Sequence, residues 1–149
     1  MTKRTKRRIP ANLHRLVKER ALGYCEYCIC PETHATQAHS NEHIMPEVLG
    51  GETTADNLAL ACQGCNNLKH IKTQAIDPVS QEFVPLFHPR KDDWHDHFAW
   101  SPDCLSLVGV TPTGRATIEA LSLNRQGVLN LRRLLLNDGL HPPTHRSYG

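Results

Sequence analysis

Two closely spaced cysteine pairs constrain this chain more than any other feature of its sequence. Cys25 and Cys28 form one CxxC pair, Cys62 and Cys65 form the other, and 33 residues separate the two pairs. Two intervening residues let both sulfurs of a tight turn face one ion, and two such turns complete a tetrahedral site. Because thiolate-rich tetrahedral sites select zinc over hard cations, this spacing predicts a structural Cys₄ zinc site that clamps two distant segments together.

Two alternatives remain open for these thiols: a redox dithiol and a set of buried free cysteines. A redox role would require one CxxC pair in a thioredoxin-like context, and no such context is visible in the sequence. Cys30 and Cys104 lie outside the pairing pattern, so we expect them to be ordinary core or surface thiols.

The rest of the chain offers few large apolar side chains for a core. Of its 149 residues, 39% are hydrophobic and only 5% are aromatic, and a domain of this kind benefits from a metal cross-link. Residues 1–8 carry five cations, but no apolar stretch follows them, so we expect no secretory signal. The sequence also lacks the run of about eighteen apolar residues that a membrane span requires. We therefore expect a cytoplasmic protein, in which thiols stay reduced and metal binding is favoured over disulfides.

Hydrophobic periodicity and turn residues predict an α+β chain with a boundary at Asp77-Pro78. Before the boundary, the pattern predicts a helix over 9–23, a strand over 36–43, a loop over 46–56, an apolar run over 57–61 and a helix from 66 to about 74. After it, the pattern predicts an extended segment over 83–87, strands over 98–100 and 105–110, a helix capped by Thr113 that reaches about Leu123, and a helix over 126–137 that ends near Gly139.

A second group of residues, recognisable by their order along the sequence, lies between the cysteine pairs and just after the second pair. It consists of Glu42-His43-Ile44-Met45-Pro46, Gly50-Gly51, Asp56-Asn57-Leu58 and Cys65-Asn66-Asn67-Leu68-Lys69. Each element alone is ordinary, since Gly-Gly is a common turn and a single histidine is usually a surface residue. In this order, and within the 45 residues from Cys25 to Lys69, they resemble the HNH endonucleases, which use a ββα-metal active site.

The resemblance implies an α+β fold with a ββα-metal (His-Me finger) nuclease core and a Cys₄ zinc clamp. We expect residues 1–8 to form a basic tail, and residues 9–76 to form the HNH nuclease domain with its zinc knuckles and an N-terminal helix. Residues 77–149 would be a C-terminal extension, a hairpin plus helices, packed on the same unit. Motifs between Ile76 and Thr117 resemble a group of stand-alone bacterial HNH proteins that carry the same extension.

The resemblance also implies an enzyme that hydrolyses phosphodiester bonds in DNA. His43 would be the general base that takes a proton from water, and Glu42 and Asn66 would hold a catalytic Mg²⁺ or Mn²⁺ ion. Asn66 stands where the family often has histidine, which is a known variation. Asn57 would brace the loop and orient His43, and Lys69 would contact phosphate from the helix.

Cations spread along the chain favour a nucleic-acid partner, although the net charge is only +2. The candidate phosphate contacts are Lys69, Lys72, Arg4, Arg7 and Arg8. No recognition helix is evident, so we expect DNA binding that is largely independent of sequence. The main alternative is a non-catalytic zinc module that only binds nucleic acid, and a third is a protein-interaction domain with an idle nuclease site. Only the enzyme requires Glu42, His43 and Asn66 together.

Overall fold

The structure is a computed structural model that describes residues 9–144. The expected basic tail, with Arg4, Arg7 and Arg8, lies outside the described residues. Within the described part, no helix is long and apolar enough to cross a membrane.

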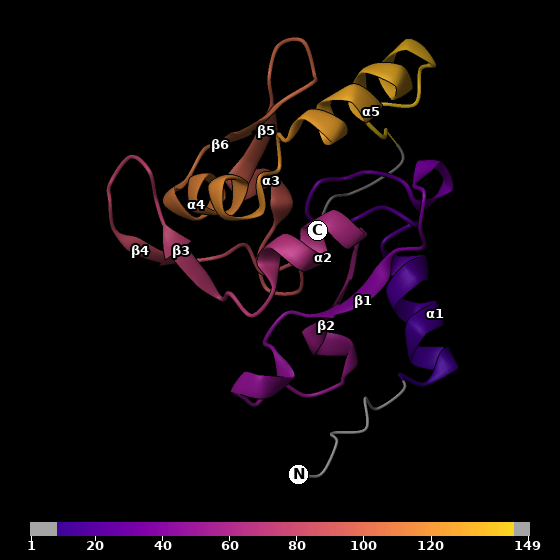
Figure 1. The fold of residues 1–149 in the computed structure, drawn as a ribbon, viewed down its shortest axis with the longest axis vertical. Helices are drawn as coiled ribbons and strands as arrows, with labels where there is room; N and C mark the ends of the chain where they lie inside the picture. The colour runs from indigo at the N-terminus through magenta and orange to yellow at the C-terminus, as the bar shows by residue number, and fades with distance from the viewer. Residues whose placement is uncertain (1–8, 145–149) are drawn as a thin grey trace.

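A ββα unit forms the centre of the fold (Figure 1). Strand β1 (Ser40–His43) pairs antiparallel with β2 (Leu58–Ala61), and helix α2 (Gln63–Lys69) follows β2 after one residue, Cys62. All four residues of β2 are buried, which suits its uniformly apolar sequence. The chain therefore has the ββα architecture and the α+β class that the sequence predicts.

Helix α1 (Ala11–Arg20), the first helix of the chain, packs against β2. Val17 and Ala21 form a small hydrophobic cluster with Leu58 and Leu60 of β2, and all four are fully buried. The helix is shorter than the predicted span of 9–23 because Pro10 serves as its N-cap and Ala21 as its C-cap.

The segment after α2 consists of two small hairpins and three helices. Its elements are β3 (Gln74–Ile76), β4 (Phe83–Pro85), α3 (Trp94–His97), β5 (Phe98–Trp100), β6 (Leu107–Gly109), α4 (Pro112–Leu121) and α5 (Gln126–Asn137). β3 pairs antiparallel with β4, and β5 pairs antiparallel with β6. Figure 1 shows α2 between these elements and the β1–β2 hairpin, and α2 contacts both α4 and the two strands.

Three local expectations were wrong. Helix α2 begins at Gln63 rather than Asn66, because Cys62 is its N-cap and accepts a hydrogen bond from the Cys65 amide at 3.4 Å. The helix ends at Lys69, where its C-cap His70 has a positive φ of 50°, rather than at about residue 74, and Gln74 instead begins strand β3. Thr111, not Thr113, caps α4, since its Oγ1 accepts from the amide of Gly114 at 3.0 Å.

One hydrophobic cluster joins the first cysteine knuckle (Cys25–Cys28, with Ile29) to the C-terminal elements. Tyr27 of the knuckle lies in the same buried cluster as Trp94, Phe98 and Leu121. The knuckle is therefore covered by residues from more than sixty positions further along the chain.

Arg132 of α5 joins these two regions through its guanidinium group. Its side chain is 2% exposed, and it donates to the carbonyls of Cys28 (3.1 Å), Leu123 (2.9 Å) and Leu105 (2.9 Å). The guanidinium also lies 5.2 Å from the ring centroid of Trp100, a cation–π distance. Since these carbonyls belong to separate segments, Arg132 holds α5 against the knuckle.

We predict that Arg132→Leu strongly destabilises the protein. The variant leaves the buried carbonyls of Cys28 and Leu123 without this donor, at a cost of about 3 kcal/mol in the free energy of unfolding. Urea denaturation measures the effect, with Arg133→Leu as the matched control because Arg133 is the exposed neighbour on the same helix. Equal unfolding midpoints for the two variants would contradict this role of Arg132.

Candidate active site and cysteine cluster

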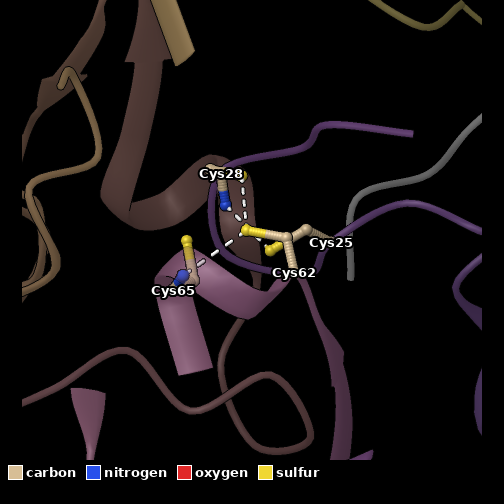
Figure 2. Close-up of side chains that lie close together, drawn as sticks. All are labelled: Cys25, Cys28, Cys62 and Cys65. Carbon is tan, nitrogen blue, oxygen red and sulfur yellow. Dashed lines mark hydrogen bonds between the residues drawn. The ribbon is translucent and has the colours of Figure 1, made fainter. Parts of the chain in front are cut away.

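The four cysteines of the two CxxC pairs converge on one point. Their sulfur atoms all lie within 4.8 Å of one another, and all four side chains are buried. Cys28 Sγ and Cys62 Sγ are 3.6 Å apart, close to the edge of about 3.8 Å in a tetrahedron with zinc–sulfur bonds of about 2.3 Å. Figure 2 shows the sulfurs approaching from the first knuckle and from the start of α2. The predicted Cys₄ cluster is thus confirmed, and its geometry suits a structural zinc ion.

Arg125 supplies positive charge beside this cluster. Its guanidinium donates to Cys62 Sγ at 3.5 Å and to Cys65 Sγ at 3.6 Å. Burial raises the pKa of the Cys25 thiol, and a nearby cation opposes such a rise by favouring the thiolate. Because metal ligation requires thiolates, the charge of Arg125 favours the metal-binding form. Cys30 and Cys104 are free thiols outside the four-sulfur cluster.

The first knuckle is also bonded directly to β2. The amide of Glu26 donates to the carbonyl of Leu60 at 2.8 Å, and the amide of Leu60 donates to the Glu26 carboxylate at 2.8 Å. The cysteine cluster and these hydrogen bonds therefore hold the knuckle, strand β2 and the start of α2 together as one unit. Asn66 directly follows the clustered Cys65 on that helix.

An open cavity of about 1250 Å³ lies over β1 and α2. The candidate residues Glu42, His43 and Asn66 all line it, together with Glu47. The structure thus brings into one cavity the three residues expected to act as base and metal ligands. Lys72 is exposed, on the turn that follows α2.

Glu42 is buried and has a donor on each carboxylate oxygen. Lys69 Nζ donates to Oε1 at 2.6 Å and the Tyr27 hydroxyl donates to Oε2 at 2.7 Å, and Glu42 is 3% exposed. Burial raises the pKa of Glu42, while the charge of Lys69 and both hydrogen bonds oppose that rise. The carboxylate is consequently held in one orientation by the first knuckle and by the last turn of α2.

The position of Lys69 corrects an expectation from the sequence. Its side chain is 1% exposed, and its ammonium group also donates to the carbonyl of Ile44 at 2.9 Å. A buried ammonium with these partners does not fit the expected phosphate contact. Instead, Lys69 neutralises Glu42 and holds the backbone immediately after His43.

His43 contacts two side chains from the loop that follows it. Its Nε2 lies 2.9 Å from Thr53 Oγ1 and 3.0 Å from Glu47 Oε1. Asn57 braces this loop, since its Nδ2 donates to the carbonyls of Met45 and Glu52 and its Oδ1 accepts from the Met45 amide. In the described residues, the side-chain bonds of Asn57 reach the loop backbone rather than the imidazole.

Sequence reasoning missed four residues beside the site. Glu47 and Thr53 contact His43, Tyr27 contacts Glu42, and His14 of α1 is hydrogen-bonded to Asn41 at 3.0 Å on the cavity wall. The available signals were weak: a carboxylate four positions after His43, and a hydroxyl shortly after the Gly-Gly turn.

We predict that Lys69→Met destabilises the fold by about 3–5 kcal/mol, because it leaves a buried carboxylate without its counter-charge. Thermal or urea unfolding measures this, and Lys72→Met is the control because Lys72 is exposed. Adding Glu42→Gln to Lys69→Met should recover part of the loss, since the uncompensated charge is removed. A single Lys69→Met variant as stable as the Lys72→Met control would contradict the buried ion pair.

Comparison with known proteins agrees with this geometry. Residues 25–72 match the family model for HNH endonucleases. No curated protein and no solved structure gives a match. The matched segment begins at Cys25, contains both cysteine pairs and His43, and includes β1, β2 and α2. The likeness to the HNH endonuclease family therefore covers residues 25–72, about a third of the chain.

Proposed function

We propose that this protein is a metal-dependent endonuclease that hydrolyses phosphodiester bonds in DNA. The observation that carries the proposal is the common cavity lined by His43, Glu42 and Asn66 within the matched HNH domain. Hydrolysis of a phosphodiester requires a nucleophile, neutralisation of charge at the phosphate and help for the leaving oxygen. These three residues are of the types that can meet those needs.

His43 is the proposed general base. Its imidazole lies on the cavity wall at the end of β1, where it can take a proton from an attacking water molecule. The loop braced by Asn57 holds it there, so little reorganisation is needed when substrate binds.

Glu42 and Asn66 are the proposed ligands of a divalent ion, Mg²⁺ or Mn²⁺. A carboxylate offers about four acceptor positions, so Glu42 retains free lone pairs beside its bonds to Lys69 and Tyr27. Asn66 contributes an amide oxygen from the half-buried first turn of α2, directly after Cys65. Such a hard ion, when bound by oxygen ligands, neutralises charge at the scissile phosphate.

Zinc at Cys25, Cys28, Cys62 and Cys65 has a structural role in this proposal. Four sulfur ligands leave no open position for water, so the zinc takes no part in hydrolysis. The catalytic ion and the structural ion are therefore separate and are held by different donor atoms.

DNA binding is proposed to depend mainly on phosphate contacts and little on sequence. Lys72 is an exposed cation shortly after α2, and Arg4, Arg7 and Arg8 belong to the segment before the described residues. The alternative function, a non-catalytic nucleic-acid-binding module, shares the zinc site and the cations. The two differ in whether the cavity residues carry out cleavage.

A supercoiled-plasmid assay with Mg²⁺ or Mn²⁺ tests the proposal. Wild-type protein should cleave the plasmid. The His43→Ala variant should cleave it about 10²- to 10⁴-fold more slowly, because the general base is removed. Asn66→Ala should weaken the divalent ion, so that a higher metal concentration restores part of its activity. Asn67→Ala is the matched control, because Asn67 is the exposed neighbour on α2.

Three results would contradict the proposal or its role assignments. DNA binding without cleavage by the wild-type protein would support the non-catalytic module. Equal cleavage by wild type, His43→Ala and Asn66→Ala would show that the activity does not come from this cavity. Full rescue of His43→Ala by metal, with Asn66→Ala like wild type, would refute the two assigned roles.

A further inference from the structure

Three side-chain groups meet around one nitrogen of His43. Nε2 lies 3.0 Å from Glu47 Oε1 and 2.9 Å from Thr53 Oγ1, and the Thr53 hydroxyl donates to Glu47 Oε1 at 3.2 Å. These distances form a closed triangle of hydrogen-bonding contacts beside the imidazole. All three residues lie within eleven positions of one another, at the end of β1 and in the loop that follows.

The donors and acceptors in this triangle determine where the imidazole proton lies. An ionised carboxylate only accepts, so Glu47 can only accept from Nε2. The single hydrogen of the Thr53 hydroxyl is used toward Glu47, so its oxygen can only accept from Nε2 as well. Two acceptors facing one nitrogen require a hydrogen on that nitrogen. In the neutral ring, Nε2 therefore carries the proton and Nδ1 carries the free lone pair.

The loop backbone is built to keep this triangle in place. Gly51 passes so close to the carbonyl of Met45 that an added Cβ would lie 1.7 Å from its oxygen, which only glycine permits. Asn57 fastens Met45 and Glu52 with three hydrogen bonds, so the ends of the segment that carries Glu47 are held together. Thr53 directly follows Glu52. The backbone thus fixes Glu47 and Thr53 beside Nε2 of the ring before any substrate binds.

We propose that Glu47 and Thr53 are positioning residues for His43, which hold its Nε2–H tautomer and thereby leave Nδ1 as the atom that accepts the proton from water. This inference rests on the proposed function of His43 as general base. When Nδ1 takes that proton, the negative charge of Glu47 stabilises the imidazolium that forms. Thr53 contacts both the carboxylate and the ring, and so fixes the position of one relative to the other. Neither residue touches the reacting atoms, and both act through His43.

The kinetic test compares variants of both residues with matched controls from the same loop. Glu47→Ala should lower kcat by about 10- to 100-fold, as is usual for a group that orients a catalytic histidine, with little change in KM for DNA. Glu47→Gln keeps an acceptor oxygen and should lie between Glu47→Ala and wild type. Glu52→Gln, at an exposed glutamate, is the control.

Thr53 is tested in the same way. Thr53→Val should lower kcat, and Thr53→Ser should restore it because the hydroxyl returns. Thr54→Val is the control at the exposed neighbouring threonine. Added Mg²⁺ should rescue neither Glu47→Ala nor Thr53→Val, since a positioning residue does not hold the ion.

A double-mutant cycle decides whether Glu47 acts through His43. Adding Glu47→Ala to His43→Ala should cause no further loss of kcat, because the group that it orients is already gone. An additional loss equal to that in wild type would overturn the proposal. Rescue of Glu47→Ala by excess Mg²⁺ would also overturn it and would make Glu47 a metal ligand.

A measurement without catalysis separates this inference from the proposed function. In ¹⁵N-histidine-labelled protein, the ring-nitrogen chemical shifts of His43 report which nitrogen carries the proton, with His43→Ala used to assign the signals. Wild type should show protonated Nε2, and Glu47→Ala should show a mixture of tautomers. Protonated Nδ1 in the neutral ring of wild type would refute the inference, even if the protein cleaves DNA. Protonated Nε2 without any cleavage would support the positioning while refuting the nuclease proposal.

Discussion

Convergence of four cysteine sulfurs on one point is the constraint on which the rest of the structure depends. It joins the first knuckle, near the N-terminus, to the start of α2, and α2 supplies Asn66 to the cavity wall. Tyr27 lies between two of the clustered cysteines and reaches Glu42, while Asn66 directly follows Cys65. In a chain with few large apolar side chains, a cross-link at this cluster adds to the hydrogen bonds between Glu26 and Leu60 in holding these segments together. The cluster thus acts on the site through the two residues next to it.

The buried pair of Glu42 and Lys69 reinforces the same junction. Glu42 accepts from Tyr27 on the first knuckle side and from Lys69 on the α2 side, so its carboxylate connects the two elements that the cysteines bring together. Two arginines from the C-terminal elements lie against the same junction between the first knuckle and α2. Arg125 contacts the cysteine sulfurs, and Arg132 binds the carbonyl of Cys28. The C-terminal elements therefore cover and neutralise the cluster rather than standing apart from it.

Some of this architecture could be predicted from sequence because it depends on local spacing. The CxxC pairs predicted the cluster, and the order of motifs between them predicted the ββα unit. Burial of Lys69 could not be predicted, because it depends on a carboxylate 27 positions away that the strand turns inward. Likewise, the contact of Thr53 with His43 depends on how the Gly51 turn closes. The start of α2 at Gln63 depends on a cysteine sulfur acting as the cap, for which propensity gives no signal.

X-ray absorption at the zinc edge of the purified protein tests the clamp most directly. A zinc ion bound by Cys25, Cys28, Cys62 and Cys65 should show a shell of four sulfur atoms at about 2.3 Å, with no nitrogen or oxygen in that shell. Protein isolated without zinc, or zinc with nitrogen or oxygen ligands at about 2.0–2.1 Å in place of sulfur, would contradict the clamp.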